Sequence, residues 1–545
     1  MVAPIPLPNV PVLDVAIVGA GLCGLALART LNTRGLNIQL FEARERLGGR
    51  ILSAHCDTSQ QMLDLGPTWF WSETEPRISA LLGELGIPSQ AQYDPGDALW
   101  LTDPNRQPER RSEPGGVHVG ARCITGGAAR LIQALAATLP PNGIHLGRAV
   151  TGLRDQGAYM ELQTSNGSPI RARQVVLALP PRLIHEHLQF TPPLPSAVWE
   201  ALTNAPTWMA AQAKSVTTFK QAFWRAAGHS GNAFVRHAQA VLAEVFDCSD
   251  SGSATHGGAL GGFVALNAAQ RESFQRGLPL LIDSQLAQLF GPQAQDGQLF
   301  LQDWARERWT CSTRDRASPP EAPFSDPLLR QPLWQGRLFL GGSETAAHGV
   351  GHMEGALESA DRIAHAICRT HARGHSALAH TPPPTAPEEA QVTRSTALGM
   401  FAASVLELRG MAPERYRLHL IRLLSSQQSE WLTQRALLAV ADQVYSESLA
   451  RLDHLLPALD TPNAAVTHGR HALTTTLLAA FEGWNKGLLD AALSFNATSC
   501  ALSNFPLEHQ PDADTLHAIT LDLAAAWREF ALELNTRLLV AASET

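Results

Sequence analysis

The sequence predicts an α/β fold followed by an all-α domain, and three observations support this prediction. From Val12 to about Arg373, strand-like apolar runs alternate with helical stretches, which is the pattern of α/β proteins. A proline-rich segment, His380–Glu389, is typical of a linker between domains. Beyond this segment the strand-like runs vanish, and amphipathic helical patterns remain.

Composition and charge limit the classes of protein to which this chain belongs. Its 545 residues are 45% hydrophobic, which is enough apolar material for a sizeable core. The net charge of −8 argues against nucleic-acid binding, because such affinity rests on clustered basic charge. The cysteines form no C-x-x-C motif, and His348 and His352 lack a third ligand, so we expect neither a disulfide framework nor a metal site.

The sequence also favours a cytoplasmic location. The first residues lack the basic and long apolar regions of a signal peptide, so we expect none. We find no run of 18 apolar residues that would predict a membrane span. Dispersed cysteines suit a reducing compartment.

The strongest motif lies at the start of the α/β region. An apolar strand, Val12–Val18, runs into the pattern Gly19-x-Gly21-x-x-Gly24 and then into a helix. Gly19 permits the tight turn, Gly21 lets backbone N–H groups approach a pyrophosphate, and Gly24 lets the helix pack closely on the strand. The motif therefore predicts a dinucleotide-binding turn.

The residues that follow complete this site. A second strand, Ile38–Phe41, ends at Glu42, where a carboxylate accepts hydrogen bonds from the ribose hydroxyls of a dinucleotide. Arg44 follows, and then a glycine pair that ends at Gly49 comes directly before Arg50. Glycine backbone and a guanidinium at this position suit contact with a pyrophosphate.

At this point the chain resembles the flavin-dependent amine oxidase family, which includes monoamine and polyamine oxidases. In that family the same fingerprint binds FAD, so the resemblance implies FAD here. The resemblance continues, in family order, through Asp64–Trp71, Ile124–Leu135, the "AVTGL" strand, Val175–Pro181 and Arg337–Ile367. It implies that Gly66, Pro67 and Thr68 pass the flavin and that Val150 meets the adenine.

The resemblance also implies a domain division. The implied parts are a Rossmann-type, glutathione-reductase-like FAD-binding domain (residues 12–75, 120–182 and 300–372), an α+β substrate domain (76–119 and 183–299), a linker (373–389) and an all-α domain (390–545).

A late strand-to-helix junction adds further expected cofactor contacts. The strand Leu338–Leu340 ends in two glycines, and Glu344 follows at the edge where open α/β sheets bind ligands. We expect Glu344 to hold the ribityl hydroxyls, although an exposed loop acid is the alternative interpretation. A helix that starts near Met353 would direct its N-terminal amides at negative charge on the flavin.

The resemblance assigns two residues to the reacting centre. Lys214 matches the family lysine that hydrogen-bonds a water beside the flavin, although a lysine that reaches solvent is the alternative. Trp304 matches the tryptophan beside the flavin. Thr313 stands where monoamine oxidases carry a cysteine joined to FAD, and Cys311 is out of register, so we expect non-covalent FAD.

The substrate side departs from the family pattern. Arg314 and His352 stand where two tyrosines usually form an aromatic cage, so Trp69 and Trp309 are candidate walls. His352 is our third catalytic candidate, because it can steer substrate or accept a proton. Trp69 also stands where amino-acid oxidases hold an arginine for the substrate carboxylate, which favours an amine without that group. Arg314 or Arg236 could supply the arginine from elsewhere.

The first functional hypothesis is an FAD-dependent amine oxidase. A hydride leaves the carbon next to the amine nitrogen, the imine hydrolyses, and O2 accepts the electrons to form H2O2. An L-amino-acid oxidase, or a flavin-dependent desaturase or dehydrogenase of the same fold, is the alternative.

The C-terminal region is expected to be helical throughout. The amphipathic stretches are Ala397–Leu408, Arg415–Leu424, Gln428–Leu456, Ala472–Leu493 and Thr515–Ala541, with breaks at Pro413, at Pro457 and Pro462, and across Pro506–Pro511. These helices form either an extra layer over the substrate domain or a module for binding a partner or forming a homo-oligomer.

Overall fold

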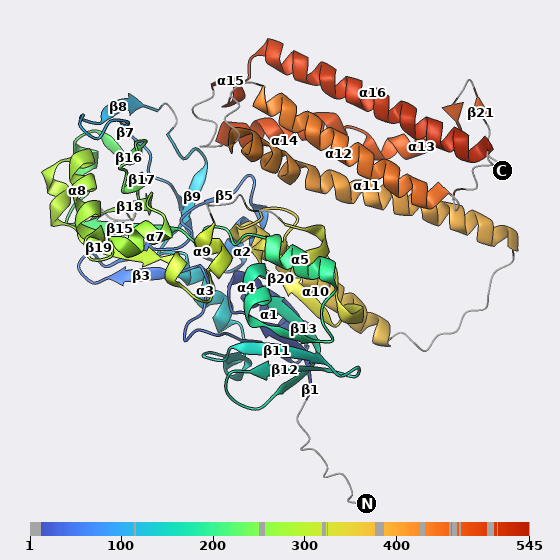
Figure 1. Cartoon of the computed structure of the whole chain (residues 1–545), viewed down its shortest axis with the longest axis horizontal. Helices are drawn as coiled ribbons and strands as arrows, with labels where there is room; N and C mark the ends of the chain where they lie inside the picture. The colour runs from blue at the N-terminus through green and yellow to red at the C-terminus, as the bar shows by residue number, and fades with distance from the viewer. Residues whose placement is uncertain are drawn as a thin grey trace, which may run out of the picture. The chain divides into compact units, whose positions relative to one another are not determined.

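The structure is a computed structural model that describes residues 12–113, 116–249, 257–318, 323, 325–375, 386–425, 431–456, 459, 466–467, 470–498, 506–509 and 511–543. The chain divides into two compact units, Met1–Gly374 and His375–Thr545. The N-terminal unit holds the large sheets, whereas the described part of the C-terminal unit is mostly helical (Figure 1). The predicted order of an α/β region and an all-α region is therefore confirmed.

The first sheet of the N-terminal unit is built around two long parallel strands. Its strands in spatial order are β10 (Ile144–His145), β2 (Ile38–Phe41), β1 (Val12–Val18), β13 (Ile170–Ala178), β12 (Met160–Thr164), β11 (Val150–Asp155) and β14 (Gln189–Thr191), and β20 (Leu338–Gly341) also pairs with β13. β1 pairs in parallel with β2 and β13, and β13 pairs in parallel with β20. The carboxyl ends of these four strands therefore meet at one edge, which is where such sheets bind ligands.

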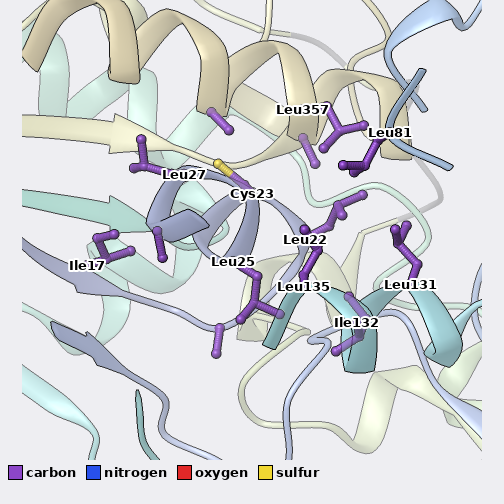
Figure 2. Packing of buried hydrophobic residues seen from close by; sticks show 14 of the residues in the cluster. Ile17, Leu22, Cys23, Leu25, Leu27, Leu81, Leu131, Ile132, Leu135 and Leu357 are labelled. Carbon is purple, nitrogen blue, oxygen red and sulfur yellow. The ribbon is translucent and has the colours of Figure 1, made fainter. Parts of the chain in front are cut away.

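The helix after β1 is buried between the sheet and two other helices. It is α1 (Leu22–Thr33), and its neighbours are α3 (Ala129–Ala137) and α10 (Met353–His375). Figure 2 shows Leu22 and Leu25 of α1 on the side near Leu135 of α3, and Leu27 on the other side of α1, toward Ile17 of β1; all belong to one buried cluster. Because burying one leucine side chain contributes about 1.5–3 kcal/mol, this cluster fixes α1 firmly behind the sheet edge.

Two glycines let α1 approach the turn after β1. Gly19 has φ +103°, and a Cβ on it would lie 2.4 Å from the carbonyl oxygen of Ala178. A Cβ on Gly24 would lie 2.0 Å from the carbonyl oxygen of Gly19. The close packing that the motif predicted is therefore present, and a larger residue has no room at either position.

The second large sheet of the N-terminal unit contains the strand that carries the candidate lysine, Lys214. Its strands in spatial order are β19 (Gln298–Asp303), β15 (Ala213–Phe219), β18 (Gly258–Val264), β17 (Leu242–Asp247), β16 (His229–Val235), β7 (Asp97–Leu101) and β8 (Glu109–Ser112). Helix α8 (Leu278–Phe290) buries its apolar face against this sheet (Figure 1).

Smaller elements connect the two large sheets. The small strands are β3 (Ser53–Cys56) paired with β4 (Gln61–Asp64), and β9 (Ala121–Ile124) between β5 (Phe70–Trp71) and β6 (Ser89–Ala91). The remaining α-helices of this unit are α2 (Pro76–Glu84), α4 (Pro181–His187), α5 (Ser196–Asn204), α6 (Phe223–Ala226), α7 (Ala268–Ser273) and α9 (Thr313–Ala317).

The C-terminal unit contains three long helices that pack side by side (Figure 1). They are α11 (Ala386–Ser425), α12 (Leu432–Leu455) and α16 (Ala513–Ser543). Its shorter elements are β21 (Val466–Thr467), β22 (Arg470–His471), α13 (Thr474–Leu478), the 3₁₀ turn η9 (Ala479–Phe481), α14 (Trp484–Thr498) and α15 (Pro506–His509). No helix in the described residues has the length and apolarity needed to cross a bilayer.

The boundaries of this unit correct several predictions. The predicted linker 373–389 is helical at both ends, because α10 runs to His375 and α11 starts at Ala386, and residues 376–385 lie outside the described residues. The predicted helix Ala472–Leu493 is interrupted between α13 and α14, where Gly483 has φ +69°. The short strands β21 and β22 were not predicted.

The predicted break at Pro413 is wrong, because α11 continues through this residue. A proline inside a helix removes one hydrogen bond and costs about 3 kcal/mol. Leu408, Ala412 and Tyr416 lie four residues apart on one face of α11 and are buried, and α11 packs against both α12 and α14. Burial of this face offsets the local cost, so tertiary packing overrides the helix-breaking signal.

The glycine packing behind the dinucleotide turn gives a stability test. Gly24→Ala should destabilise the cofactor-free protein by about 1–3 kcal/mol, because its new methyl group meets a backbone carbonyl that has nowhere to move. Gly83→Ala is the matched control, since the exposed Gly83 of α2 has open space around it, and alanine there should stabilise by roughly 0.5–1 kcal/mol. Chemical unfolding of the three proteins measures both changes. Equal stability of Gly24→Ala and the unaltered protein would contradict the packing.

Candidate functional site

A large cavity opens at the sheet edge where β1, β2, β13 and β20 end. Its volume is about 460 Å³. Every predicted cofactor and catalytic residue except Gly24 lines it, namely Gly19, Gly21, Glu42, Arg44, Gly49, Arg50, Gly66, Pro67, Thr68, Val150, Lys214, Trp304, Glu344, His352 and Met353. Gly24 lies behind the wall, where it packs on Gly19.

The dinucleotide turn presents open space and unpaired donors to this cavity. A Cβ placed on Gly21 would meet no heavy atom within 4 Å. The first N–H groups of α1, which starts at Leu22, have no partners within the helix, and the helix dipole adds partial positive charge there. The turn therefore fits the diphosphate of a dinucleotide.

Glu42 is fixed at the end of β2 by backbone groups. Its carboxylate accepts hydrogen bonds from the N–H of Ala20 at 2.8 Å and from the N–H of Arg44 at 3.0 Å. Because a carboxylate offers about four acceptor positions, two remain for the cavity that Glu42 lines. This arrangement fits recognition of two ribose hydroxyls.

The Arg44 side chain joins this region to the loop that contains Glu307 and Thr310. Its guanidinium lies 3.6 Å from Glu42, donates to Glu307 at 3.2 Å and donates to the hydroxyl of Thr310 at 2.6 Å. Trp309, which lies beside Thr310, also lines the cavity. Arg44 therefore connects the ribose end of the cavity to a candidate substrate wall.

Arg50 and Glu344, which the sequence assigned separately to the cofactor, form a two-pronged ion pair. Nη1 of Arg50 lies 2.6 Å from Oε1 of Glu344, and Nη2 lies 2.9 Å from Oε2. The fully buried carboxylate also accepts from the hydroxyl of Ser343 and from the backbone N–H of Trp208. With four donors already bound, a ribityl hydroxyl would have to compete for Glu344, so its predicted contact stays a prediction.

Lys214 reaches the cavity from β15 and is almost completely buried. Its ammonium donates to the carbonyl oxygen of Gly66 at 2.9 Å and to the hydroxyl of Thr68, which leaves one N–H for the cavity. Burial lowers the pKa of Lys214, while the nearby carboxylate of Asp64 acts in the opposite direction. The alternative interpretation, a lysine that reaches solvent, is therefore wrong.

Aromatic side chains form much of the remaining wall. Trp304 donates from Nε1 to the carbonyl oxygen of Leu65 at 3.0 Å, which holds its ring beside the segment that precedes Gly66. The other aromatic rings at the cavity are those of Phe41, Trp69, Trp71, Trp208, Phe263 and Trp309. An apolar cavity with a few fixed polar groups is the usual form of a small-molecule site.

His352 lies at the start of α10, where the sequence placed it, and remains exposed. Its Nδ1 lies 2.9 Å from the carbonyl oxygen of Val350, and its ring centroid is 6.0 Å from that of Trp208. His348 does not line the cavity. Within the described residues, no group of three histidine, cysteine or acidic side chains could hold a metal ion.

Neither candidate for an additional carboxylate-binding arginine lines the cavity. Arg314 bonds to the side chain of Asn204 at 3.3 Å, and Arg236 bonds to the carbonyl oxygen of Ala243 at 3.0 Å. Arg314 points away because the next residue, Asp315, turns inward to a buried ion pair with Arg182. The suggestion that either arginine binds substrate is therefore wrong.

Sequence reasoning missed several residues of the cavity, including His187, Trp208, Met209 and Phe263. A Trp-Met pair shortly before the candidate lysine was a usable signal, because large side chains near a reacting residue often form its walls. Met209 has φ +60°, a strained conformation for a residue other than glycine, and such strain gathers at functional sites. Phe263 carries no local signal, because only strand pairing brings it opposite Lys214.

Comparisons with known proteins identify the family that this chain resembles. The family model described as flavin containing amine oxidoreductase matches residues 98–368, and an NAD(P)-binding Rossmann-like domain matches residues 17–85. A probable flavin-containing monoamine oxidase A of Dictyostelium discoideum is 24% identical over 456 residues, which cover 65% of this chain and 97% of that protein. Putrescine oxidase of Kocuria rosea is 24% identical over 456 residues, which cover 63% and 92%.

Solved structures show the same fold. A redesigned putrescine oxidase aligns with a TM-score of 0.56 at 20% identity, over 66% of this chain and 100% of that one. Cyclohexylamine oxidase from Brevibacterium oxydans aligns with a TM-score of 0.55 at 19% identity, over 67% and 100%. Through its N-terminal unit, this chain therefore belongs to the flavin-containing amine oxidoreductases and is an FAD-dependent enzyme that acts on amines.

Proposed function

We propose that the enzyme oxidises amines that lack an α-carboxylate, with non-covalently held FAD and with O2 as the electron acceptor. The observation that carries this proposal is the position of Lys214, which is buried in the same cavity as a dinucleotide turn and an aromatic wall. Relatives named as monoamine and putrescine oxidases support an amine substrate.

Different residues of the chain would bind different parts of the cofactor. The turn at Gly21 and the amides of α1 would hold the diphosphate, and Glu42 would hold the adenosine ribose. Val150 and Met353 line the same cavity and would contact the two ends of the cofactor. When bound, FAD supplies a two-electron acceptor that takes a hydride from the carbon next to nitrogen and returns the electrons to O2 as H2O2.

The positions of Thr313 and of the cysteines support non-covalent attachment of FAD. Thr313 hydrogen-bonds to Glu186, and neither Thr313 nor Cys311 lines the cavity. Cys23 does line it, but burial raises the pKa of this thiol to about 11, so it stays protonated and unreactive. No described cysteine is therefore placed and ionised for bonding to the cofactor.

Lys214 is suited to activating oxygen. Its contacts with Gly66 and Thr68 fix the ammonium beside the segment that is expected to pass the flavin. Its remaining N–H is available to donate a hydrogen bond to a group in the cavity. A fixed cation in a site shielded from water stabilises the negative charge that develops as O2 accepts electrons. The same N–H would orient the water that hydrolyses the imine.

The walls favour an amine without a carboxylate. The guanidinium groups that line the cavity are those of Arg44, Arg50 and Arg148. Arg44 and Arg50 are paired with glutamates, and Arg148, two residues before Val150 at the expected adenine end of the cavity, donates to the carbonyl oxygen of Ser168. A substrate carboxylate would therefore be desolvated without a dedicated partner, at a cost of several kcal/mol, about the cost of an unpaired buried charge. His352 lies at this cavity and would accept a proton from the substrate ammonium.

Gly21→Ala separates cofactor binding from folding. We expect the dissociation constant for FAD to rise at least about tenfold, because the new methyl group occupies the space that the diphosphate needs. The stability of the cofactor-free protein should stay unchanged, since the methyl group meets no protein atom there. Titration with FAD and chemical unfolding measure the two effects. Unchanged FAD affinity would place the diphosphate elsewhere.

Lys214→Met tests the oxygen role. We expect reoxidation of the reduced holoenzyme by O2 to slow about 100-fold, as when one electrostatic donor is removed, with FAD content unchanged. Stopped-flow absorbance after anaerobic reduction measures this rate. Lys220→Met is the control, because Lys220 is exposed just beyond the end of β15. If the two variants react with O2 equally fast, Lys214 has no such role.

A matched substrate pair tests the amine class. Phenethylamine and L-phenylalanine differ only in the carboxylate, so the ratio of their kcat/KM values isolates its cost. We expect phenethylamine to be preferred by about 100-fold or more, because the site lacks a free partner for the carboxylate. H2O2 production by the purified holoenzyme gives both values. A preference for the amino acid would favour the amino-acid oxidase alternative.

A further inference from the structure

A buried histidine lies behind one wall of the cavity and takes no part in the proposed reaction. His118 is 3% exposed, and each ring nitrogen faces a carboxylate. Nδ1 lies 3.1 Å from Oδ1 of Asp94, and Nε2 lies 3.3 Å from Oε1 of Glu244. Because ionised carboxylates only accept hydrogen bonds, both nitrogens must donate, and the ring is an imidazolium.

The cluster is anchored in three elements of the substrate side. Asp94 comes from the loop before β7, Glu244 from β17, and Asn232 of β16 donates to Asp94 at 2.8 Å. The backbone N–H of His118 donates to the second oxygen of Asp94 at 2.7 Å. Burial lowers the pKa of His118, but the two carboxylates outweigh it and raise the pKa to about 9.

Trp69 connects this cluster to the cavity. Its ring centroid lies 4.4 Å from that of His118 and 4.5 Å from that of Phe246, and its Nε1 donates to Gln92 at 2.8 Å. Trp69 also lines the cavity, whereas His118 does not. A cation against an aromatic face attracts the ring, most strongly where both groups are removed from water.

We propose that the cluster of Asp94, His118 and Glu244 holds Trp69 in place as the wall that contacts the apolar part of the amine. His118 is then a positioning residue that sets amine affinity without touching the substrate. This inference rests on the proposed function, because the wall matters for affinity only if an amine binds beside it.

The cluster makes the wall sensitive to alkaline pH. The charged groups that face the imidazole ring are Asp94 and Glu244, and its other neighbours are the rings of Trp69 and Phe246. Because the pKa of His118 is raised above its ordinary value of 6.5, the charged ring stabilises the folded cluster fully below pH 6.5. It is lost as the pH rises through about 9, when one carboxylate loses its donor and Trp69 loses its cation.

His118→Gln tests the positioning role, because glutamine keeps a donor but never carries the charge. At pH near 7.5 we expect its KM for phenethylamine to be about tenfold higher, with kcat and flavin content unchanged. Above pH 9 the KM of the unaltered enzyme should approach that of the variant, and ionisation of the amine cancels in this comparison. His229→Gln is the control, because His229 lies in the sheet that carries Glu244 but its ring contacts Phe290, and it should behave like the unaltered enzyme. An equal KM for His118→Gln and the unaltered enzyme at every pH would overturn the proposal.

Glu244→Gln gives an independent test that needs no substrate. The glutamine keeps an acceptor beside His118 but removes one negative charge. The midpoint of the pH-dependent change at Trp69, which follows deprotonation of His118, should therefore fall below pH 9. The contribution of Trp69 to the near-ultraviolet circular dichroism of the holoenzyme, isolated by subtracting the spectrum of Trp69→Phe, follows this midpoint. A midpoint that does not move would overturn the proposal. This test remains decisive even if the His118→Gln variant fails to fold. If phenethylamine and other amines are not oxidised, the proposed function fails while this spectroscopic test still decides the role of the cluster.

Discussion

The ion pair between Arg50 and Glu344 is the constraint on which the site depends. It joins the glycine-rich turn after β2 to the end of β20, two segments almost 300 residues apart in the sequence. Arg50 also donates to the carbonyl oxygen of Trp208, and Glu344 accepts from the N–H of the same residue, so the pair holds the entry to β15. A buried pair of this kind contributes little net stability compared with apolar packing, but loss of one partner leaves a buried charge unpaired. Its role is therefore to fix one arrangement of three chain segments around the cavity.

The sequence predicted the cofactor half of the site better than the substrate half, for a physical reason. The contacts of Gly24 with Gly19 and of Glu42 with Ala20 join residues at most 22 positions apart in the chain, so spacing alone implied their geometry. The substrate wall depends on pairing across the second sheet, which places Phe263 opposite Lys214 and brings Glu244 to His118. Nothing in the local sequence of these residues indicates their partners. The error at Arg314 has the same origin, because its direction is set by the burial of Asp315 against Arg182.

The C-terminal unit shows the opposite limit of sequence reasoning. Helical periodicity predicted its class, yet the helix boundaries followed packing rather than local propensity, as at Pro413. Within this unit Tyr445 stacks on Phe530 with ring centroids 4.4 Å apart, and Glu508 accepts hydrogen bonds from the N–H groups of Leu432 and Thr433 at the start of α12. These contacts explain how the helices hold together as a unit. A role for residues 390–545 in binding a partner or forming an oligomer stays a prediction.

One short stretch, Asp64–Trp69, contains residues predicted to pass the flavin, contacts Lys214 and ends at the proposed substrate wall. Its backbone accepts from Trp304 at Leu65 and from Lys214 at Gly66, its Thr68 hydroxyl accepts from Lys214, and its last residue packs on His118. Because these contacts share one short continuous segment of backbone, a displacement at one of them moves the others. Substitutions at Trp69 and Lys214 should therefore be non-additive, as expected for residues coupled through a common segment. Lys214, proposed to activate oxygen, and Trp69, proposed to contact the amine, are then structurally coupled, and the identity of residue 69 affects more than the shape of the pocket.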